Sequence, residues 1–308
     1  MRVAYGEALA DLGAIDPGVI VLDADLSSAT GTATFAAKYP GRFFNAGIAE
    51  ANMVGMAAGI ASMGLTVFCS TFAVFGAGRA YEQIRNAVVY SDFNVKIACT
   101  HGGITAGQDG GSHQAIEDFA LMRVLPGMTV VVPCDVIELR KAIFAAAKSV
   151  GPMYIRIGRW PASTVTSQET PFEIGKANVM VENGQDAVIF ATGIMVPEAV
   201  AAAEILKNDG IKVAVVNIHT LKPLDLETVR RFALATRVVI TAEEHSIIGG
   251  LGDAVAAALI GESLTFRKVG INDVFGESGL PDEMLELHGL TARHLVEHAK
   301  SMLKVTIR

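Results

Sequence analysis

The sequence predicts an α/β protein of two domains, each built on a mainly parallel sheet that is flanked by helices. Three observations support this prediction: apolar runs of strand length alternate with segments of helical period, the runs are continuously apolar, and the alternation pauses once before it resumes. Continuously apolar strands are typical of parallel sheets that are covered on both faces. A chain of 308 residues, 51% of them hydrophobic, is long enough for two such cores.

The first half of the chain contains five candidate strands, which are rich in Val, Ile and other strand-forming residues. They are residues 19–22, 66–69, 95–99, 129–132 and 153–157. Residues 161–173 are rich in Ser, Thr and Pro and have no helical stripe, which is typical of a linker. The pattern therefore predicts a first domain at residues 1–165 and a linker at residues 166–182.

The second predicted domain, residues 183–308, repeats the alternation of strands and helices. Candidate strands are residues 187–192, 212–216 and 237–241, and candidate helices are residues 197–208, 225–235 and 252–259. Asp225 is the predicted N-cap of the second helix, because its side chain can accept a backbone N–H. The glycine-rich run at residues 249–252 lacks the spacing of a dinucleotide-binding loop, so we interpret it as the turn into a helix.

Composition and charge exclude several classes of protein. The formal net charge is −7 and there is no run of Lys or Arg, so nothing favours binding to nucleic acid or to an anionic membrane. No apolar run approaches the roughly 20 residues that span a bilayer. The three cysteines stand far apart in apolar surroundings, which indicates reduced core thiols and a cytoplasmic protein. The high hydrophobic content also suggests an apolar surface that another subunit covers.

The loop at residues 100–114 is the most informative segment, with the sequence T-H-G-G-I-T-A-G-Q-D-G-G-S-H-Q. It holds His101, Asp109 and His113 together with five glycines, and it lies between a predicted strand and a predicted helix. Loops at this position bind ligands in open α/β sheets, and glycines allow a backbone to approach a ligand closely. The pattern predicts a ligand site, although histidines that only bond to the loop and glycines that only form turns would give the same composition.

Two further segments contain candidate site residues, an acid at the start of an apolar helix and two aromatic residues after a strand. Glu50, within residues 42–64, opens a helix of mostly small and apolar residues, so we expect a buried and unpaired acid. The alternative is an exposed acid that the helix dipole favours. Phe72 and Phe75 follow a predicted strand end, and aromatic residues at this spacing are typical of a core as well as of a binding site.

Taken in this order, the A-E helix, the S-T-F segment and the loop with T-H and D-G-G-S-H-Q closely resemble the pyrimidine-binding half of transketolase, a thiamine diphosphate enzyme. The resemblance continues through residues 133–135 and 155–159 into the second domain, and it covers essentially the whole chain. The G-D-G motif that binds the metal in this family is absent from the sequence. The resemblance therefore implies the C-terminal subunit of a split, two-chain transketolase.

The resemblance also implies partners and an activity. An N-terminal subunit would carry the diphosphate-binding domain and hold the metal, Mg²⁺ or Ca²⁺, so no metal ligand is assigned to this chain. Two copies of each chain would form a heterotetramer, with thiamine diphosphate bound between subunits. The implied reaction transfers a two-carbon ketol unit from a ketose phosphate to an aldose phosphate, as in the pentose phosphate pathway.

By the same resemblance, Glu50 is a catalytic and cofactor-binding carboxyl that shares a proton with the pyrimidine ring. Phe72 and Phe75 would stack on that ring in the offset geometry that aromatic pairs favour. His101 and His113 match the substrate-facing histidines of the family, which can hydrogen-bond the oxygens of the donor and exchange protons near neutral pH. These five residues form the implied catalytic centre.

Four residues are implied in substrate binding. Asp109 resembles the family residue that reads the hydroxyl next to the ketone. Arg2 and Arg159 match phosphate-binding arginines, which suits bidentate capture of a sugar phosphate. Ser28 lies in the corresponding segment, but this chain has Ala29 where bacterial enzymes keep a phosphate-binding Ser. We therefore also consider a different anionic group on the substrate, as in a sulfonated sugar.

Other functions share parts of this pattern. The β subunit of a 2-oxo acid dehydrogenase E1 component resembles the chain in its two domains and its Glu, but those subunits generally lack the loop motif that contains His101 and Asp109. Deoxyxylulose-phosphate synthase is closer, yet it is normally one longer chain. A non-catalytic assembly protein would have no use for a buried, unpaired acid.

Overall fold

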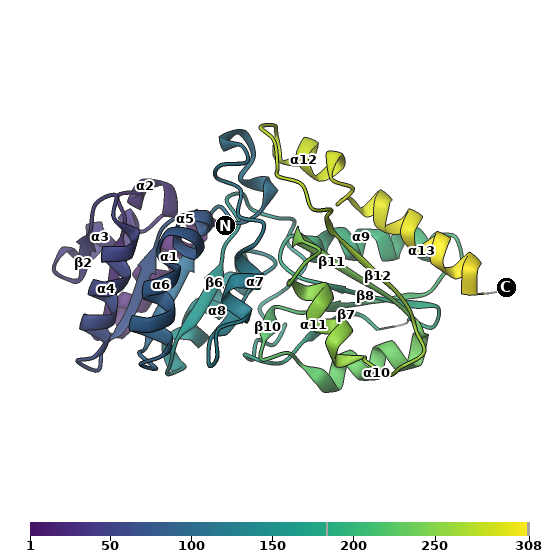
Figure 1. Ribbon diagram of the computed structural model, residues 1–308, viewed down its shortest axis with the longest axis horizontal. Coiled ribbons are helices and arrows are strands. Elements are labelled where there is room, and N and C mark those ends of the chain that lie inside the picture. The colour runs from purple at the N-terminus through teal and green to yellow at the C-terminus, as the bar shows by residue number, and fades with distance from the viewer. Residues whose placement is uncertain (183, 307–308) are drawn as a thin grey trace.

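The computed structural model describes residues 1–182 and 184–306, and it places them in two layered halves that lie side by side (Figure 1). In the first half, strands and helices alternate as the apolar pattern predicts. The elements are α1 (Arg2–Ile15), β1 (Val19–Asp23), α2 (Ser27–Thr30), α3 (Ala33–Lys38), the 3₁₀ turn η1 (Pro40–Arg42), β2 (Phe43–Asn45), α4 (Glu50–Ala61), β3 (Thr66–Ser70), α5 (Ala73–Arg79), α6 (Tyr81–Gln83), the π-helical turn η2 (Ile84–Val89), β4 (Val95–Cys99), the 3₁₀ segment η3 (Ile104–Asp109), α7 (Asp118–Arg123), β5 (Thr129–Val131), α8 (Val136–Lys148) and β6 (Met153–Arg156).

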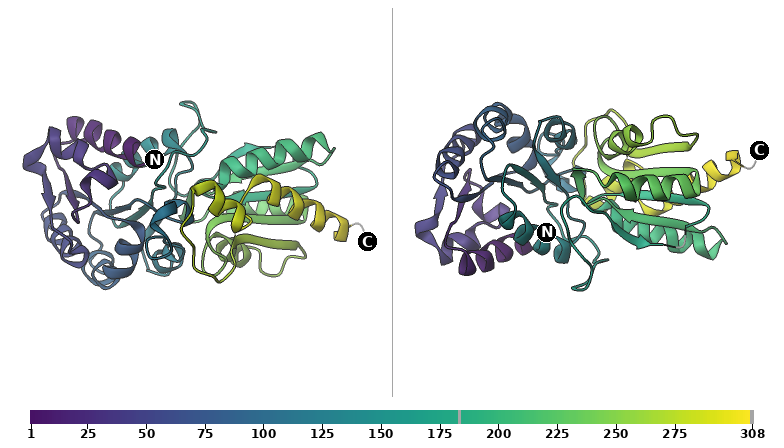
Figure 2. Two further views of the ribbon diagram at one scale, coloured as in Figure 1. Left: turned by 90° about the horizontal axis from the view of Figure 1, so that it is seen from above. Right: turned by 90° about the horizontal axis from the view of Figure 1, so that it is seen from below.

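The first sheet has the strand order β10-β5-β6-β4-β3-β1-β2, where β10 is Thr220–Lys222 of the second half. All neighbouring strands are parallel except β10 and β5, so the five predicted strands and the mainly parallel sheet are confirmed. Every residue of β1, β4 and β6 is buried. Helices α1, α3 and α8 cover one face, and α4, α5 and α7 cover the other (Figure 2).

The second half repeats this layering around a smaller sheet of strand order β12-β11-β8-β9-β7. Its elements, besides β10, are β7 (Asn178–Val181), β8 (Ala187–Ala191), α9 (Met195–Asn208), β9 (Val213–Asn217), α10 (Leu226–Thr236), β11 (Val238–Ser246), α11 (Leu251–Ala258), β12 (Thr265–Ile271), α12 (Pro281–Leu287) and α13 (Ala292–Thr306). The predicted cap is confirmed, because the Asp225 side chain accepts the backbone N–H of Thr228 at 3.1 Å. Gly249 and Gly250 form the turn into α11, as we interpreted them.

The two halves share both hydrogen bonds and a hydrophobic core. Strand β10 leaves the second half to pair antiparallel with β5 of the first sheet, with Thr220 opposite Val131. One apolar cluster of buried side chains runs across the junction, from Val130 in the first sheet to Phe232 on α10. Residues 157–177 contain neither helix nor strand, and the rest of the predicted linker forms β7, which pairs with β9.

The cysteines agree with the expectation that they are reduced core thiols. Cys69, Cys99 and Cys134 are free thiols and all three are buried. Burial raises the pKa of the Cys69 thiol to about 12, so it stays protonated at neutral pH. Across the described residues, no helix combines the length and the apolar composition that crossing a membrane requires.

Lys96 is a charged residue inside the central strand β4, which no apolar pattern predicts. Its side chain is fully buried, and its Nζ donates to the backbone carbonyl oxygens of Ser149 and Gly151, both at 2.7 Å. Two carbonyl oxygens replace part of the hydration that the ammonium loses. Burial nevertheless lowers the pKa of Lys96 to about 7.

The buried amine predicts that the contribution of Lys96 to stability increases as the pH rises above neutral. In the unfolded chain the Lys96 amine keeps its proton up to its ordinary pKa of about 10.4, so between about pH 7 and pH 10 the unfolded state binds more protons. The free energy of unfolding is expected to increase across this window by about 2–4 kcal/mol from this group. Urea unfolding of wild type and Lys96→Met at several pH values measures it, and an equal pH slope in both proteins would contradict it.

Candidate active site

The site begins where two neighbouring strands of the first sheet end. After β3 and β4 the two chains stay paired, because Thr100 donates its N–H to the carbonyl of Thr71 at 3.0 Å and Ala73 donates to the carbonyl of Thr100 at 2.7 Å. His101 then takes a left-handed backbone conformation with φ +60°, which turns the chain out of the strand direction. Residues 100–114, called the site loop below, start from this turn.

The pairing brings together four of the residues that the sequence singled out. The Phe72 and Phe75 rings stack with centroids 5.7 Å apart, and the His101 ring stacks on Phe72 at 3.8 Å. From the far end of the site loop, His113 meets the Phe75 ring edge-on at 5.2 Å. Phe72 and His101 are buried and His113 is half-buried, so the cluster forms one wall with an accessible edge.

Glu50 joins this cluster through a residue that the sequence analysis missed. It is the first residue of α4 and only 5% exposed, which confirms its predicted burial. The expectation that it is unpaired was wrong, because its Oε1 accepts from Arg79 Nη1 at 2.9 Å. The same guanidinium lies over the Phe75 ring, 4.0 Å from the centroid. The spacing of Phe75 and Arg79, four residues apart on α5, was the available signal.

The imidazole of His101 is set up as a neutral hydrogen-bonding group. Burial, together with the charges of Arg159 and Arg2 and with His113, lowers the pKa of His101 to about 3. Its Nδ1 lies 2.9 Å from Thr100 Oγ1. When that hydroxyl donates to Nδ1, Nε2 carries the proton and can donate to a ligand oxygen. The lowered pKa favours the neutral imidazole at neutral pH, and the exchange of protons by His101 during the reaction stays a prediction.

The predicted substrate-binding residues form a second group beside the first. Arg159 Nη1 lies 3.2 Å from Asp109 Oδ2 and also donates to the carbonyl of Ala106, so it braces the middle of the site loop. Arg2 donates to the carbonyl of Ala29 at 3.3 Å, which means that position 29 contributes a backbone oxygen here. Arg2 and Arg159 both line one cavity of about 420 Å³, whose other lining residues are mostly apolar.

Ser28 is the predicted site residue that the structure does not bring into either group. It lies on α2 beside Ala29, and its side chain is exposed. Within residues 1–182 and 184–306, no hydrogen bond joins its hydroxyl to another predicted site residue.

The glycines of the site loop face protein instead of a ligand, which corrects the sequence interpretation. A Cβ on Gly103 would stand 2.1 Å from Cδ of Glu244, and one on Gly102 would stand 2.2 Å from Nε of Arg156. Cβ atoms on Gly110 and Gly111 would stand 2.6 Å from Ser278 Oγ and 2.5 Å from the Gly276 carbonyl. These glycines therefore let other parts of the chain, mostly in the second half, approach the loop backbone.

Both halves of the chain match family models. Residues 1–161 match the transketolase pyrimidine-binding domain, and residues 175–295 match the transketolase C-terminal domain. A putative transketolase C-terminal section from Methanocaldococcus jannaschii is 47% identical over 308 residues, which cover 99% of this chain and 96% of that protein. The 6-deoxy-6-sulfo-D-fructose transketolase subunit SqwH of Clostridium sp. strain MSTE9 is 44% identical over 301 residues, covering 97% of this chain and 93% of that protein.

Longer relatives and a solved structure agree with these matches. Human transketolase is 37% identical over 306 residues, which cover 98% of this chain but only 49% of the human protein. A solved split-gene transketolase, an inactive β4 tetramer, superposes with a TM-score of 0.91 at 51% identity and covers 98% of both chains. The chain therefore belongs to the transketolase family and comprises its pyrimidine-binding and C-terminal domains.

Proposed function

We propose that this chain is the C-terminal subunit of a two-chain transketolase, which transfers a two-carbon ketol unit from a ketose phosphate to an aldose phosphate. The observation that carries the proposal is the joint placement of Glu50, Phe72, Phe75, His101 and His113 around the ends of β3 and β4. A buried carboxyl, an aromatic wall and two imidazoles are the side chains that ketol transfer requires at one place.

The residues present fit the pyrimidine of thiamine diphosphate. The Phe75 ring is partly exposed and is stacked with Phe72, which offers an apolar wall for a flat heterocycle. The Glu50 carboxyl is only 6% exposed, whereas its partner Arg79 is 54% exposed and can swing toward solvent. Glu50 would then hold a proton at the ring nitrogen. When bound, thiamine diphosphate supplies a nucleophilic carbon for breaking and forming the carbon–carbon bond.

The remaining site residues would bind and orient the sugar. A neutral His101 can donate from Nε2 to a substrate oxygen, and His113 faces the same wall from the other end of the site loop. Asp109, whose Oδ2 lies 3.2 Å from Arg159 Nη1, would accept a hydrogen bond from the hydroxyl next to the ketone. The cavity shared by Arg2 and Arg159 would take the anionic end of the sugar.

A partner chain is part of the proposal, because the chain covers nearly all of a transketolase C-terminal section and of a split-gene transketolase chain. An N-terminal subunit would bind the diphosphate and its Mg²⁺ or Ca²⁺, and two copies of each chain would form a heterotetramer. Phe44, Ile48 and Met63 flank α4 and are 43%, 78% and 80% exposed. Such apolar side chains around the helix that starts with Glu50 are typical of a surface that another subunit covers. The inactive state of the related β4 tetramer fits this requirement.

The proposal is tested by purifying the chain together with an N-terminal transketolase subunit. We expect the pair, supplied with thiamine diphosphate and Mg²⁺, to convert xylulose 5-phosphate and ribose 5-phosphate, and either chain alone to be inactive. Decarboxylation of a 2-oxo acid that depends on a lipoyl domain, without sugar turnover, would contradict the proposal and support an E1 component.

A sulfonated ketose is the second candidate donor. Ala29 stands where a phosphate-binding Ser is expected, and a relative of 44% identity is named for 6-deoxy-6-sulfo-D-fructose. Both anions suit the two arginines, since each offers oxygens in a bidentate arrangement. The kcat/KM values of the two-chain enzyme for phosphorylated and sulfonated ketoses, measured in parallel, decide between them.

Asp109→Asn is expected to lower discrimination between donors more than it lowers binding. The amide removes the charged acceptor for the hydroxyl next to the ketone, which is worth about 1–3 kcal/mol of selectivity or roughly tenfold and more. The measurement compares kcat/KM for a donor with that of its epimer at this hydroxyl. Asp11→Asn, which breaks an exposed pair with Arg140 at 2.8 Å, is the matched control and should leave the ratio unchanged.

A further inference from the structure

The outer side of the site loop is covered by the C-terminal domain. Figure 1 shows the connection between β4 and α7 next to the segment that leads into α12. Gly107, Gly110 and Gly111 of the loop lie against Gly279, Ser278 and Gly276 of that segment, at distances that leave little or no room for a Cβ. The loop that carries the histidines is therefore clamped between two domains, and the C-terminal domain acts on its conformation directly.

Glu244 is the polar anchor of this contact. It lies near the end of β11, is 2% exposed, and its Oε1 accepts the backbone N–H of Thr105 at 2.6 Å. On its other side, Glu244 Oε2 lies 3.9 Å from Nη1 of the buried Arg156. Gly103 leaves the space that the carboxylate occupies, since a Cβ there would stand 2.1 Å from Cδ of Glu244. A buried carboxyl group is thus aimed at one backbone amide in the middle of the loop.

Gln114 fastens the other end of the loop to the same domain. It is 3% exposed, and its Nε2 lies within hydrogen-bonding distance of three backbone carbonyls: Ile104 at 3.0 Å, Gly107 at 3.2 Å and Glu277 at 2.9 Å. Two of these carbonyls are in the loop, and the third is in the C-terminal domain. A Cβ on Gly276 would stand 1.8 Å from Gln114 Oε1, so the domain also closes sterically over this amide.

We propose that Glu244 and Gln114 are positioning residues, through which the C-terminal domain holds the site loop in the conformation that presents its histidines and aspartate to the sugar. The proposal rests on the proposed function for the identity of the bound sugar. Glu244 binds the backbone of Thr105, which lies four residues after His101. Gln114 is adjacent to His113. Among the described residues, the hydrogen bonds of the Glu244 carboxyl and of Gln114 Nε2 end on backbone groups of residues 104, 105, 107 and 277, so we expect coenzyme binding to depend little on them.

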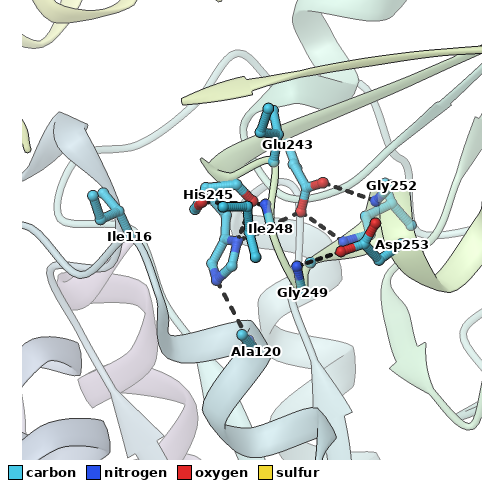
Figure 3. Close-up of polar contacts among 12 residues, drawn as sticks. Ile116, Ala120, Glu243, His245, Ile248, Gly249, Gly252 and Asp253 are labelled. Atoms are coloured by element: carbon cyan, nitrogen blue, oxygen red, sulfur yellow. Dashed lines mark hydrogen bonds and ion pairs between the residues drawn. The ribbon is translucent and has the colours of Figure 1, made fainter. Parts of the chain in front are cut away.

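The neighbouring Glu243 provides a matched control. It is equally buried and lies on the same strand, but its carboxylate accepts from Leu251 N at 2.6 Å and Gly252 N at 2.8 Å, both within its own domain (Figure 3). Glu243→Gln and Glu244→Gln therefore make the same substitution at adjacent buried positions. Only the second change weakens a bond to the site loop.

The experiment combines amide hydrogen exchange of the full chain with kinetics of the two-chain enzyme. In Glu244→Gln we expect amides of residues 103–109 to exchange about tenfold faster, because a neutral acceptor is weaker than a carboxylate. The kcat/KM for the ketose is expected to fall about tenfold, while the affinity for thiamine diphosphate stays unchanged. Gly276→Ala, which presses on Gln114 from the C-terminal domain, should have the same two effects, and Glu243→Gln should have neither.

Three results would overturn the inference. They are unchanged exchange in Glu244→Gln, equal effects of Glu243→Gln and Glu244→Gln, and faster exchange without any loss in kcat/KM for the ketose. Failure of the proposed function is a different result, namely a wild-type pair that turns over no ketose. Exchange is measured on the chain without substrate, so the two failures are told apart.

Discussion

Glu50→Ala is expected to abolish ketol transfer by the two-chain enzyme while leaving the fold of this chain intact. The side chain is buried at the start of α4, and its removal takes away the group that would hold a proton at the coenzyme. Loss of a positioned acid of this kind lowers kcat by about a thousandfold. The fold should survive because the partner that loses its ion pair, Arg79, is 54% exposed and remains solvated.

The measurement is kcat of the reconstituted pair, with the urea unfolding midpoint of the variant chain as a second observable. Glu227→Ala is the control, because Glu227 is also an acid in a first helical turn, on α10, but is exposed. If acids at helix starts act here only through the helix dipole, both variants lose a few tenths of a kcal/mol of stability and neither loses activity. Near-wild-type kcat in Glu50→Ala would contradict the proposed catalytic role.

Arg156→Met is expected to destabilise the chain by about 3–5 kcal/mol, the cost of leaving buried charges without their partner. Arg156 is 4% exposed, its Nε lies 3.3 Å from Asp118 Oδ2, and its Nη2 donates to the carbonyl of Glu244 at 2.8 Å. Asp118 also accepts from the Tyr154 hydroxyl at 2.7 Å. Methionine fills most of the space but cannot pair with the carboxylates of Asp118 and Glu244.

Urea unfolding of wild type and variant measures this loss. The control is Arg140→Met, because Arg140 pairs with Asp11 at 2.8 Å but both side chains are nearly half exposed. An exposed pair contributes only about 0–1 kcal/mol, so the control should unfold close to wild type. Equal losses in the two variants would mean that the Arg156 network contributes no more than a surface ion pair.

Local patterns were sufficient to predict most of the fold. Residues 95–99 are apolar without interruption apart from one lysine, which predicts a strand covered on both faces, and β4 is fully buried. Asp225 predicts a helix start because its side chain can accept from the free backbone amides of the first helical turn, and it caps α10. The burial of Glu50 followed in the same way from its apolar neighbours in the sequence.

Features that depend on distant segments were not predictable. Strand β2 is short and mostly exposed, so it carries no apolar run. The glycines of the site loop were expected to make room for a ligand, but Glu244 and Gly276, far along the chain, fill the space beside two of them. Arg79 was missed since its partner Glu50 lies 29 residues earlier. A sequence pattern reports period and composition, whereas these contacts depend on how distant segments pack.

The crossing of β10 into the first sheet has a consequence for any attempt to separate the halves. If the chain were cut within residues 157–177 and the fragments separated, β5 would lose its antiparallel neighbour β10 and become an exposed edge strand. An open border of this kind invites pairing with other molecules, so the isolated N-terminal fragment would tend to aggregate. In the separated C-terminal fragment, residues 220–222 would lose their pairing with β5. We therefore expect each half to depend on the other for its folding.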